Sequence, residues 1–361
     1  MNYGNFDKYP EKKVPGYQAV EGWESVRRVL RGAAGETGVL TAEFYPGVWR
    51  QELVEELGRL GFAMFDAERC AMPDEDYQRR IAEFVTDDRV FGVMNTLRLE
   101  DVYDPEKIEA MRQEIRACKG PAIVYGTGAS LVMADRRKKR LFEPMAYVGD
   151  TVIPGCPKMV EGAGFRAGLE KLAREPFRLV PYYAPEVWGG QWMKEVCGLD
   201  RRQKNYAWAF DGVPEENSVF LRVGPVRMEF PAVDVVFYRP HPLLGERVHA
   251  RFGDEFPIRF DFLDTMDGQN LSLQVPPLTE YIQNTFGMHY TQDESYYILD
   301  CADEAYVYLG LKEGIDKDAM LADLEAAQRG EIVFPAEKYV NKLPAKKHDH
   351  FLIPGGTVHC S

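Results

Sequence analysis

Residues 270–280 have the sequence NLSLQVPPLTE. Apolar and polar side chains alternate from Leu271 to Val275, and this period of two predicts a β-strand with one buried face. The pattern stops at Pro276 and Pro277, which lack the N–H group that a ladder hydrogen bond needs. The segment is either an ordinary strand end or a strand that carries part of a ligand site, and only the rest of the chain can distinguish the two.

The composition is that of a folded globular protein. The chain has 361 residues, enough for two or three domains, and it is 45% hydrophobic and 28% charged, which excludes a disordered polypeptide. The formal net charge of −13 argues against unspecific binding to nucleic acid or to an anionic membrane. A local site can still oppose this global sign and accept an anionic small molecule.

Cysteine usage and the N-terminal residues bear on the compartment. The six cysteines are scattered and include no CxxC pair, so we expect reduced thiols in a reducing compartment. The first residues, MNYGNFDKYPEKK, contain no apolar signal region, and no window approaches 18 apolar residues. The sequence therefore predicts a soluble cytoplasmic protein with no membrane or nucleic-acid partner.

Helical and strand patterns alternate in the first part of the chain. Apolar spacing predicts helices over 20–34, 48–61 and 104–120, and residues 38–47 have the pattern of a strand that ends in a Pro-Gly turn. Strands that alternate with helices favour a parallel sheet covered by helices. We therefore expect an α/β domain of unknown role over residues 1–150.

The pattern changes in the second part of the chain, residues 178–361. Short β-rich runs, such as VRMEFPAVDVVFYRP (226–240), alternate with turns rich in Gly, Pro, Asp and Asn, which is typical of an all-β sandwich or barrel. One helix is predicted to interrupt this part, over 316–330. Residues 152–168 carry two prolines and four glycines, so we predict a linker over 151–177.

One glycine-rich turn, Gly126-Thr127-Gly128, follows a strand, PAIVY. Its N–H groups can cradle a phosphate, but the turn lacks the third glycine of a dinucleotide site and the GK[ST] of a phosphate-binding loop. A plain tight turn is the first interpretation and an anion site the second. The basic run 136–140 either assists such an anion site or forms a solvated helix face. A separate phosphate-linked activity of this domain is the least supported function.

Polar residues near the C-terminus carry stronger chemical signals. Glu294 begins an apolar strand in QDESYYILD, and His289 stands five residues earlier. His359 follows a Pro-Gly-Gly turn near the start of the next strand. A glutamine, a glutamate and a histidine supply the N and O ligands expected of a zinc-type divalent site. The alternative is that these are solvated residues at strand ends and turns.

These stretches together resemble the class I mannose-6-phosphate isomerases, which are zinc enzymes of the cupin fold. The resemblance covers about 178–361. It rests on four stretches in matching order: PYYAPEVWGG (181–190), FPIRFDFLDTMDGQNLSLQV (256–275), QDESYYILD (292–300) and HFLIPGGTVH (350–359). It implies an α+β multidomain protein in which an N-terminal α/β domain precedes an incomplete cupin-type double-stranded β-helix. The N-terminal half is similar to an extension found on some bacterial members.

The resemblance also implies a set of metal ligands. The glutamine, glutamate and C-terminal histidine of the family fall on Gln274, Glu294 and His359, and the expected cofactor is zinc. The remaining ligand of the family, a histidine, corresponds to Pro276, which has no side-chain donor atom. We take His289 as a candidate to replace the missing imidazole.

Other positions that are typical of the family concern substrate binding. By analogy, Trp188 and Ser272 line the sugar-phosphate side of the site. Two family lysines correspond to Gln292 and Asp261, so positive charge is lost where a sugar phosphate must bind. No residue present is a convincing proton shuttle.

The implied function is that of a metal-dependent aldose–ketose isomerase that interconverts mannose 6-phosphate and fructose 6-phosphate, impaired by Pro276 and by truncation. The family barrel continues beyond His359 and carries its catalytic arginine there, so we expect a truncated chain or one completed by a second polypeptide. The alternative is a non-catalytic cupin that acts as a sugar-phosphate sensor or an assembly partner.

Overall fold

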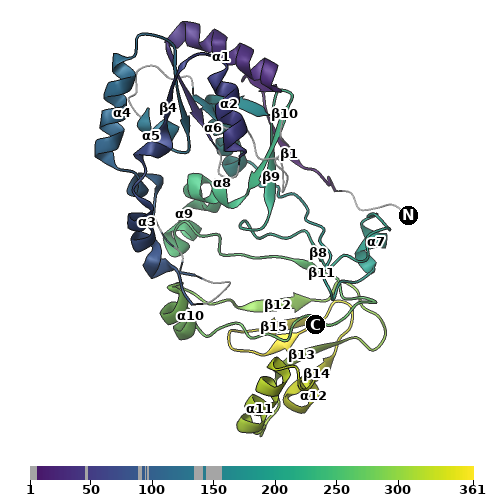
Figure 1. The fold of residues 1–361 in the computed structure, drawn as a ribbon. Coiled ribbons are helices and arrows are strands. Elements are labelled where there is room, and N and C mark those ends of the chain that lie inside the picture. The colour runs from purple at the N-terminus through teal and green to yellow at the C-terminus, as the bar shows by residue number, and fades with distance from the viewer. Residues whose placement is uncertain are drawn as a thin grey trace.

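The computed structural model describes residues 6–44, 48–87, 92, 93, 95, 97–133, 141–143 and 157–361. Figure 1 shows an architecture of mixed helices and strands, with a helix-flanked sheet at one end of the molecule and the strands near the C-terminus at the other. No helix in these ranges is both long and apolar enough to cross a membrane. The basic run 136–140 lies outside the described residues.

A six-stranded sheet organises the N-terminal half, in the order β2-β7-β6-β3-β5-β4. The β3–β5, β3–β6 and β4–β5 pairs are parallel, and the β2–β7 and β6–β7 pairs are antiparallel. Every residue of β5 is buried, as expected for a parallel strand covered on both faces. The strands are β2 (Ala19–Glu21), β3 (Val39–Glu43), β4 (Ala63–Asp66), β5 (Ala122–Gly126), β6 (Leu141–Glu143) and β7 (Lys158–Glu161). The strand expected within 38–47 is confirmed over Val39–Glu43, and the Pro-Gly turn expected at its end lies outside the described residues.

Helices cover both faces of this sheet. Leu40 of β3 belongs to a buried cluster formed with α1 and α2, and Val124 of β5 belongs to a second cluster formed with α4 and α5. The helices predicted over 20–34, 48–61 and 104–120 are confirmed, with ends that differ by a few residues. The elements are α1 (Trp23–Thr37), α2 (Arg50–Gly58), η1 (Ala67–Cys70), α3 (Asp74–Ile81), η2 (Ala82–Phe84), η3 (Leu99–Val102), α4 (Pro105–Ala117) and α5 (Ala129–Val132).

The described part of the expected linker, 151–177, contains regular structure. β7 joins the six-stranded sheet, and α6 (Gly162–Arg174) follows it directly. A Cβ atom on Gly168 would lie 2.4 Å from Cδ2 of Leu221, and one on Gly164 would lie 2.6 Å from Cβ of Tyr17. The glycines that indicated a linker therefore allow close packing of α6 against its neighbours.

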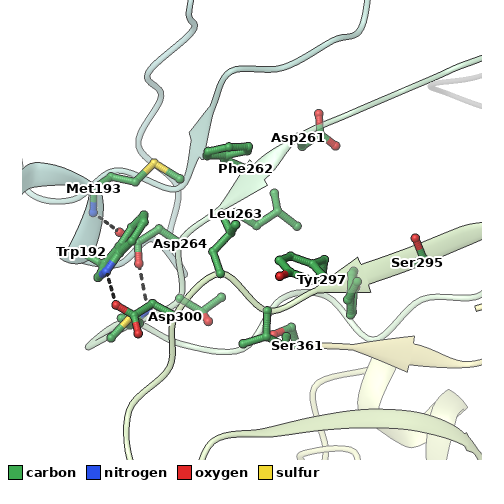
Figure 2. Close-up of a pocket in the computed structure, with 15 residues that line it drawn as sticks. Trp192, Met193, Asp261, Phe262, Leu263, Asp264, Ser295, Tyr297, Asp300 and Ser361 are labelled. Carbon is green, nitrogen blue, oxygen red and sulfur yellow. Dashed lines mark hydrogen bonds between the residues drawn. The ribbon is translucent and has the colours of Figure 1, made fainter. Parts of the chain in front are cut away.

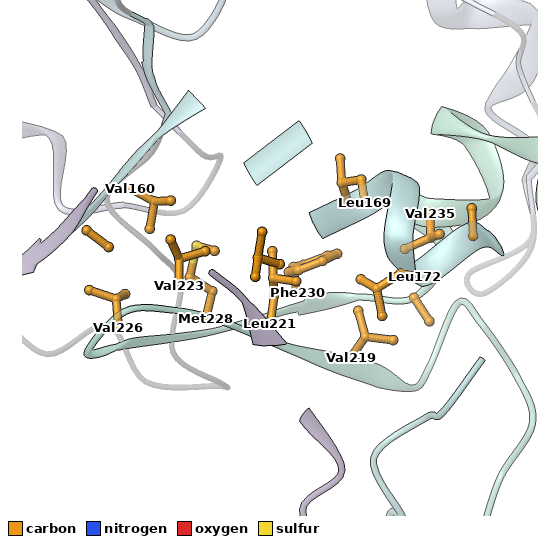
Figure 3. Packing of buried hydrophobic residues seen from close by; sticks show 14 residues of the cluster. Val160, Leu169, Leu172, Val219, Leu221, Val223, Val226, Met228, Phe230 and Val235 are labelled. Carbon is orange, nitrogen blue, oxygen red and sulfur yellow. The ribbon is translucent and has the colours of Figure 1, made fainter. Parts of the chain in front are cut away.

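A three-stranded sheet, β1-β9-β10, joins the two halves of the chain. β1 (Glu11–Val14) runs parallel to β9 (Ser218–Val223), which is antiparallel to β10 (Val226–Pro231). Nε of Arg222 on β9 lies 2.7 Å from a carboxylate oxygen of Glu11 on β1. Figure 3 shows the buried cluster that these strands share with α6 and with β7. An N-terminal strand is thus part of the core of the second half.

Leu221 tests the importance of this shared core. Its side chain is fully buried, and Gly168 beside it has no side chain that can move into a vacated space. We expect Leu221→Ala to lower the free energy of unfolding by about 2–5 kcal/mol, measured by urea denaturation. Leu321→Ala on an exposed helix surface is the control and should change it by less than about 0.5 kcal/mol. A similar small effect at Leu221 would contradict the shared core.

The second half contains more helix than expected. The helix predicted over 316–330 is confirmed as α11, but the predicted β run 226–240 changes after β10 into α8, because a short apolar run fits a buried helix as well as a strand. The helices are α7 (Trp192–Val196), α8 (Val233–Tyr238), α9 (Pro240–Phe252), α10 (Thr279–Phe286), α11 (Lys317–Gln328) and α12 (Ala336–Tyr339).

The remaining strands form three small antiparallel sheets: β8 with β11, β12 with β15, and β14-β13-β16. The incomplete cupin-type double-stranded β-helix remains a prediction. The strands are β8 (Trp208–Ala209), β11 (Phe262–Leu263), β12 (Glu294–Tyr297), β13 (Tyr306–Leu311), β14 (Val340–Pro344), β15 (His350–Ile353) and β16 (His359–Cys360).

Candidate functional site

The segment before Pro276 lies antiparallel to β16, but it pairs with it at one position. N–H of Gln274 donates to the carbonyl of His359 at 3.0 Å, and N–H of His359 donates to the carbonyl of Gln274 at 2.9 Å. Leu271 and Leu273 pack against a buried cluster, as their alternation predicted. The expected continuous strand is thus shortened to an isolated bridge beside the two prolines.

The three side chains expected to bind metal meet at His359. Its Nε2 lies 3.2 Å from the side-chain amide nitrogen of Gln274 and 3.2 Å from Oε2 of Glu294. The imidazole of His359 is fully buried, the Glu294 side chain is 16% exposed, and Gln274 is exposed. The group therefore combines a buried nitrogen with two side chains that a ligand can reach.

The backbone fixes the orientation of the imidazole. Nδ1 of His359 lies 3.0 Å from the carbonyl oxygen of Thr357, which accepts its N–H and directs Nε2 toward Glu294. Burial is the largest effect on the pKa of His359 and lowers it, but the hydrogen bonds to Glu294 and Thr357 together raise the pKa above its ordinary value. The ring of Tyr296 packs edge-on against the imidazole, with centroids 5.6 Å apart.

Pro276 and His289, the two positions considered for a fourth ligand, differ from each other in burial. Pro276 is buried, and its carbonyl accepts a hydrogen bond from N–H of Gly356 at 2.7 Å. His289 is exposed, in the segment that follows α10. In the part of the chain that the structure describes, no three His, Cys, Asp or Glu side chains form a group able to hold a metal. The structure therefore does not bring His289 to Glu294 and His359.

The residues predicted to contact substrate are not on the described cavity. Trp188 is 8% exposed and packs edge-to-face on Trp208, with ring centroids 5.2 Å apart. Its carbonyl accepts from N–H of Gln269 at 3.0 Å. Ser272 is exposed. Trp188 is thus a core residue in this structure, and a contact between Ser272 and substrate stays a prediction.

A cavity of about 160 Å³ lies between α7, β11 and β12, and none of Gln274, Glu294 and His359 lines it (Figure 2). It lies against β12, where Ser295 and Tyr296 directly follow Glu294. Asp261 also lines it, and its carboxylate interacts electrostatically with Glu294. The lining residues are Trp192, Met193, Asp261, Phe262, Leu263, Asp264, Thr265, Met266, Ser295, Tyr296, Tyr297, Ile298, Leu299, Asp300 and Ser361.

Two carboxylates hold α7 against this cavity. Asp264 is buried and accepts hydrogen bonds from N–H of Met193 at 2.8 Å and N–H of Met266 at 3.0 Å. Burial raises the pKa of Asp264, and the hydrogen bonds from these amides oppose that rise. Nε1 of Trp192 donates to Asp300 at 3.1 Å. The sequence offered no signal for these residues, because the contacts join segments far apart in the chain.

The glycine-rich turn after β5 is occupied by carboxylates of the chain itself. Glu43 accepts hydrogen bonds from N–H of Gly128 at 2.6 Å and from N–H of Ser130 at 2.7 Å, and Glu68 accepts one from N–H of Thr127 at 3.2 Å. Burial raises the pKa of Glu43, although these amides oppose the rise. The structure therefore favours the plain turn over an external anion site.

Sequence comparison places about half of the chain among relatives of one enzyme class. The chain is 24% identical over 189 residues to the mannose-6-phosphate isomerase ManA of Bacillus subtilis. The aligned segment covers 52% of this chain and 55% of that protein. The chain is 25% identical over 186 residues to the probable mannose-6-phosphate isomerase GmuF of the same organism, covering 51% and 54%. The chain thus spans about half the length of these relatives and is a distant homologue of mannose-6-phosphate isomerases over that part.

Two further comparisons concern the fold and the N-terminal half. The mannose 6-phosphate isomerase structure from B. subtilis matches 50% of this chain and 53% of its own, at 20% identity and a TM-score of 0.38. A variant phosphomannose isomerase from Salmonella typhimurium matches 50% and 64%, at 15% identity and a TM-score of 0.37. Residues 22–134 match a family described as a domain of unknown function (DUF8485).

Proposed function

We propose that this protein is a metal-dependent aldose–ketose isomerase that interconverts mannose 6-phosphate and fructose 6-phosphate. The observation that carries the proposal is the convergence of Gln274, Glu294 and His359 from three separate segments. Their nitrogen and oxygen donors suit zinc, which these three side chains would hold. The choice of mannose 6-phosphate as substrate comes from the names of the distant relatives.

The residues present fit a divalent ion. Gln274, Glu294 and His359 would hold it, and when bound it would supply Lewis-acid stabilisation of the negative charge that develops on the carbonyl oxygen of the open-chain sugar. The carbonyl of Thr357 accepts the Nδ1–H of His359 and holds the imidazole in one orientation, as hydrogen-bond acceptors behind metal-binding histidines do. The ring of Tyr296 packs against that imidazole and adds to its burial.

The chain departs from a four-ligand site at Pro276. The proline ring offers no donor atom, so the site depends on the three remaining side chains. Isomerisation requires a proton to move between the first two carbons of the sugar, and a positioned acid–base group lowers the barrier to that transfer. We propose that the sugar reaches the site through the cavity along β12, which Ser295 and Tyr296 line.

Turnover by the zinc-loaded chain tests this function. We expect the purified protein to convert mannose 6-phosphate to fructose 6-phosphate in a coupled assay, and Glu294→Gln to reduce the rate by at least about tenfold. Glu280→Gln on the exposed surface of α10 is the control and should leave the rate unchanged. Saturable binding of mannose 6-phosphate by the folded, zinc-loaded chain without turnover would replace this proposal with the non-catalytic sensor.

A further inference from the structure

The cavity between α7, β11 and β12 is lined by acidic side chains. Asp261 directly precedes β11 and Asp264 directly follows it, and Asp300 lies with Asp264 beside Trp192 (Figure 2). Among the described residues that line this cavity there is no lysine, arginine or histidine. An anion that entered the cavity would therefore meet carboxylates and no cationic side chain in its wall.

Two of the three carboxylates are held in place by the protein itself. Asp264 accepts hydrogen bonds from two backbone amides, and Nε1 of Trp192 donates to Asp300. Nζ of Lys347 lies 3.6 Å from Oδ1 of Asp300, which is longer than a normal hydrogen bond. Lys347 therefore offsets the charge of Asp300 only in part, and the carboxylates at this end of the cavity remain fixed.

The third carboxylate, Asp261, has more anions than cations around it. Partial burial, followed by the charge of Glu216, raises its pKa; Arg259 opposes this rise and Glu294 adds to it. Arg259 is itself engaged by another carboxylate, because its guanidinium lies 3.3 Å from Glu215. Since Asp261 is also exposed, a ligand can reach it. A phosphate group placed there would be repelled by like charge.

The rest of the wall suits an uncharged ring. Trp192, Phe262, Tyr296 and Tyr297 line the cavity. The C–H groups of a sugar ring can pack on such aromatic side chains, and carboxylate oxygens accept hydrogen bonds from its hydroxyl groups. The cavity of about 160 Å³ is close in volume to a protein cavity of about 150 Å³ that holds one benzene ring. Its size and chemistry therefore match a single hydroxylated six-membered ring.

We propose that this cavity selects an uncharged sugar over a sugar phosphate, so that the chain takes up unphosphorylated mannose in preference to mannose 6-phosphate. The inference rests on the proposed function for the path of the sugar to the candidate metal ligands, whereas the binding preference depends on the cavity. Asp261 sets the preference, because it is exposed and surrounded by more carboxylates than cations. The relatives' names suggest the phosphorylated sugar, and the carboxylates of this chain favour the unphosphorylated one.

Equilibrium binding to the full, zinc-supplemented chain tests the preference without requiring turnover. Trp192 lines the cavity, so tryptophan fluorescence can report binding. At low ionic strength, we expect mannose to bind at least about tenfold more tightly than mannose 6-phosphate. Added salt should reduce this difference, because it screens the repulsion between the phosphate and the carboxylates. A phosphate-attracting site would show the opposite, since salt would then weaken the binding of mannose 6-phosphate.

Asp261→Lys tests the residue that sets the preference. We expect this variant to bind mannose 6-phosphate at least about tenfold more tightly than the wild type does, because a repulsive charge becomes an attractive one. Asp303→Lys is the matched control, since it makes the same change of charge at an exposed residue that does not line the cavity. It should leave the affinity within about twofold of the wild-type value.

The possible outcomes separate this inference from the proposed function. Tighter binding of mannose 6-phosphate than of mannose by the wild type, saturable binding of neither sugar, or equal effects of the two lysine variants would each overturn the inference, even if the chain proves to be an isomerase. A preference for mannose in a zinc-loaded chain that isomerises neither sugar would support the selective cavity and remove the proposed function.

Discussion

At about pH 8, replacing Asp211 with asparagine is expected to raise the free energy of unfolding by up to about 4 kcal/mol. Asp211 is 4% exposed, and its Oδ1 has no hydrogen-bond partner among the residues that the structure describes. Burial, followed by the neighbouring charges of Asp261 and Glu216, raises its pKa to about 7. The charged form of this carboxyl is therefore poorly accommodated in the folded protein.

The sign of the pH dependence follows from the raised pKa. Between the ordinary aspartate value of 3.8 and about 7, the folded protein keeps the proton of Asp211 while the unfolded chain loses it. Stability from this group is therefore fully present below about pH 4 and decreases as the pH rises to about 7. Asparagine carries no charge at any of these pH values, so its advantage should appear only as the pH increases.

Urea denaturation of wild type and Asp211→Asn at about pH 4 and about pH 8 measures this effect. Asp200→Asn is the control, because Asp200 is exposed and hydrogen bonds to Arg202 lower its pKa. That variant should show no gain at the higher pH. An equal increase in the free energy of unfolding from Asp211→Asn at both pH values would show that the unpaired Oδ1 of Asp211 destabilises the protein, and that the charge does not.

Local sequence signals predicted the N-terminal elements well. α4 has an aspartate that caps it and a proline in its first turn, and Asp104 accepts hydrogen bonds from the amides of Glu106 and Lys107 as that pattern requires. Such features act within one turn of helix. The linker expected over 151–177 is replaced by regular structure over Lys158–Arg174, where Gly168 allows close contact with Leu221, a residue far along the chain. Composition alone does not distinguish a flexible glycine from a closely packed one.

In the candidate site, too, some features could be predicted from the sequence and others depend on tertiary packing. The family resemblance implied that Gln274, Glu294 and His359 belong together, and the structure places side-chain atoms of Gln274 and Glu294 each 3.2 Å from Nε2 of His359. The burial of Trp188 against Trp208 depends on tertiary packing, so the sequence pattern could not exclude it from the ligand-facing residues. Tyr296 could have been found, because it stands two residues from Glu294 on the same strand face.

Zinc binding is expected to depend on the group around His359. The purified chain should hold about one zinc per molecule by elemental analysis, and Glu294→Gln and His359→Ala should each reduce this to a small fraction. Since His359 is fully buried, circular dichroism must show that the variants remain folded. His289 is exposed and outside the group, so His289→Ala should leave the zinc content unchanged. A sharp loss in that variant would return His289 to the ligand shell.

Pro276→His is expected to strengthen zinc binding by a factor on the order of 10². Four-ligand zinc sites bind with about 10–16 kcal/mol, so one ligand contributes roughly 3 kcal/mol. Pro276 lies two residues after Gln274, so a histidine there would extend from the same side of an extended segment. Pro277→His is the matched control, because its imidazole would face the other side. Competition with a chelator measures the zinc affinity of both variants. An equal increase in affinity would show that any added histidine suffices and that residue 276 does not occupy a ligand position.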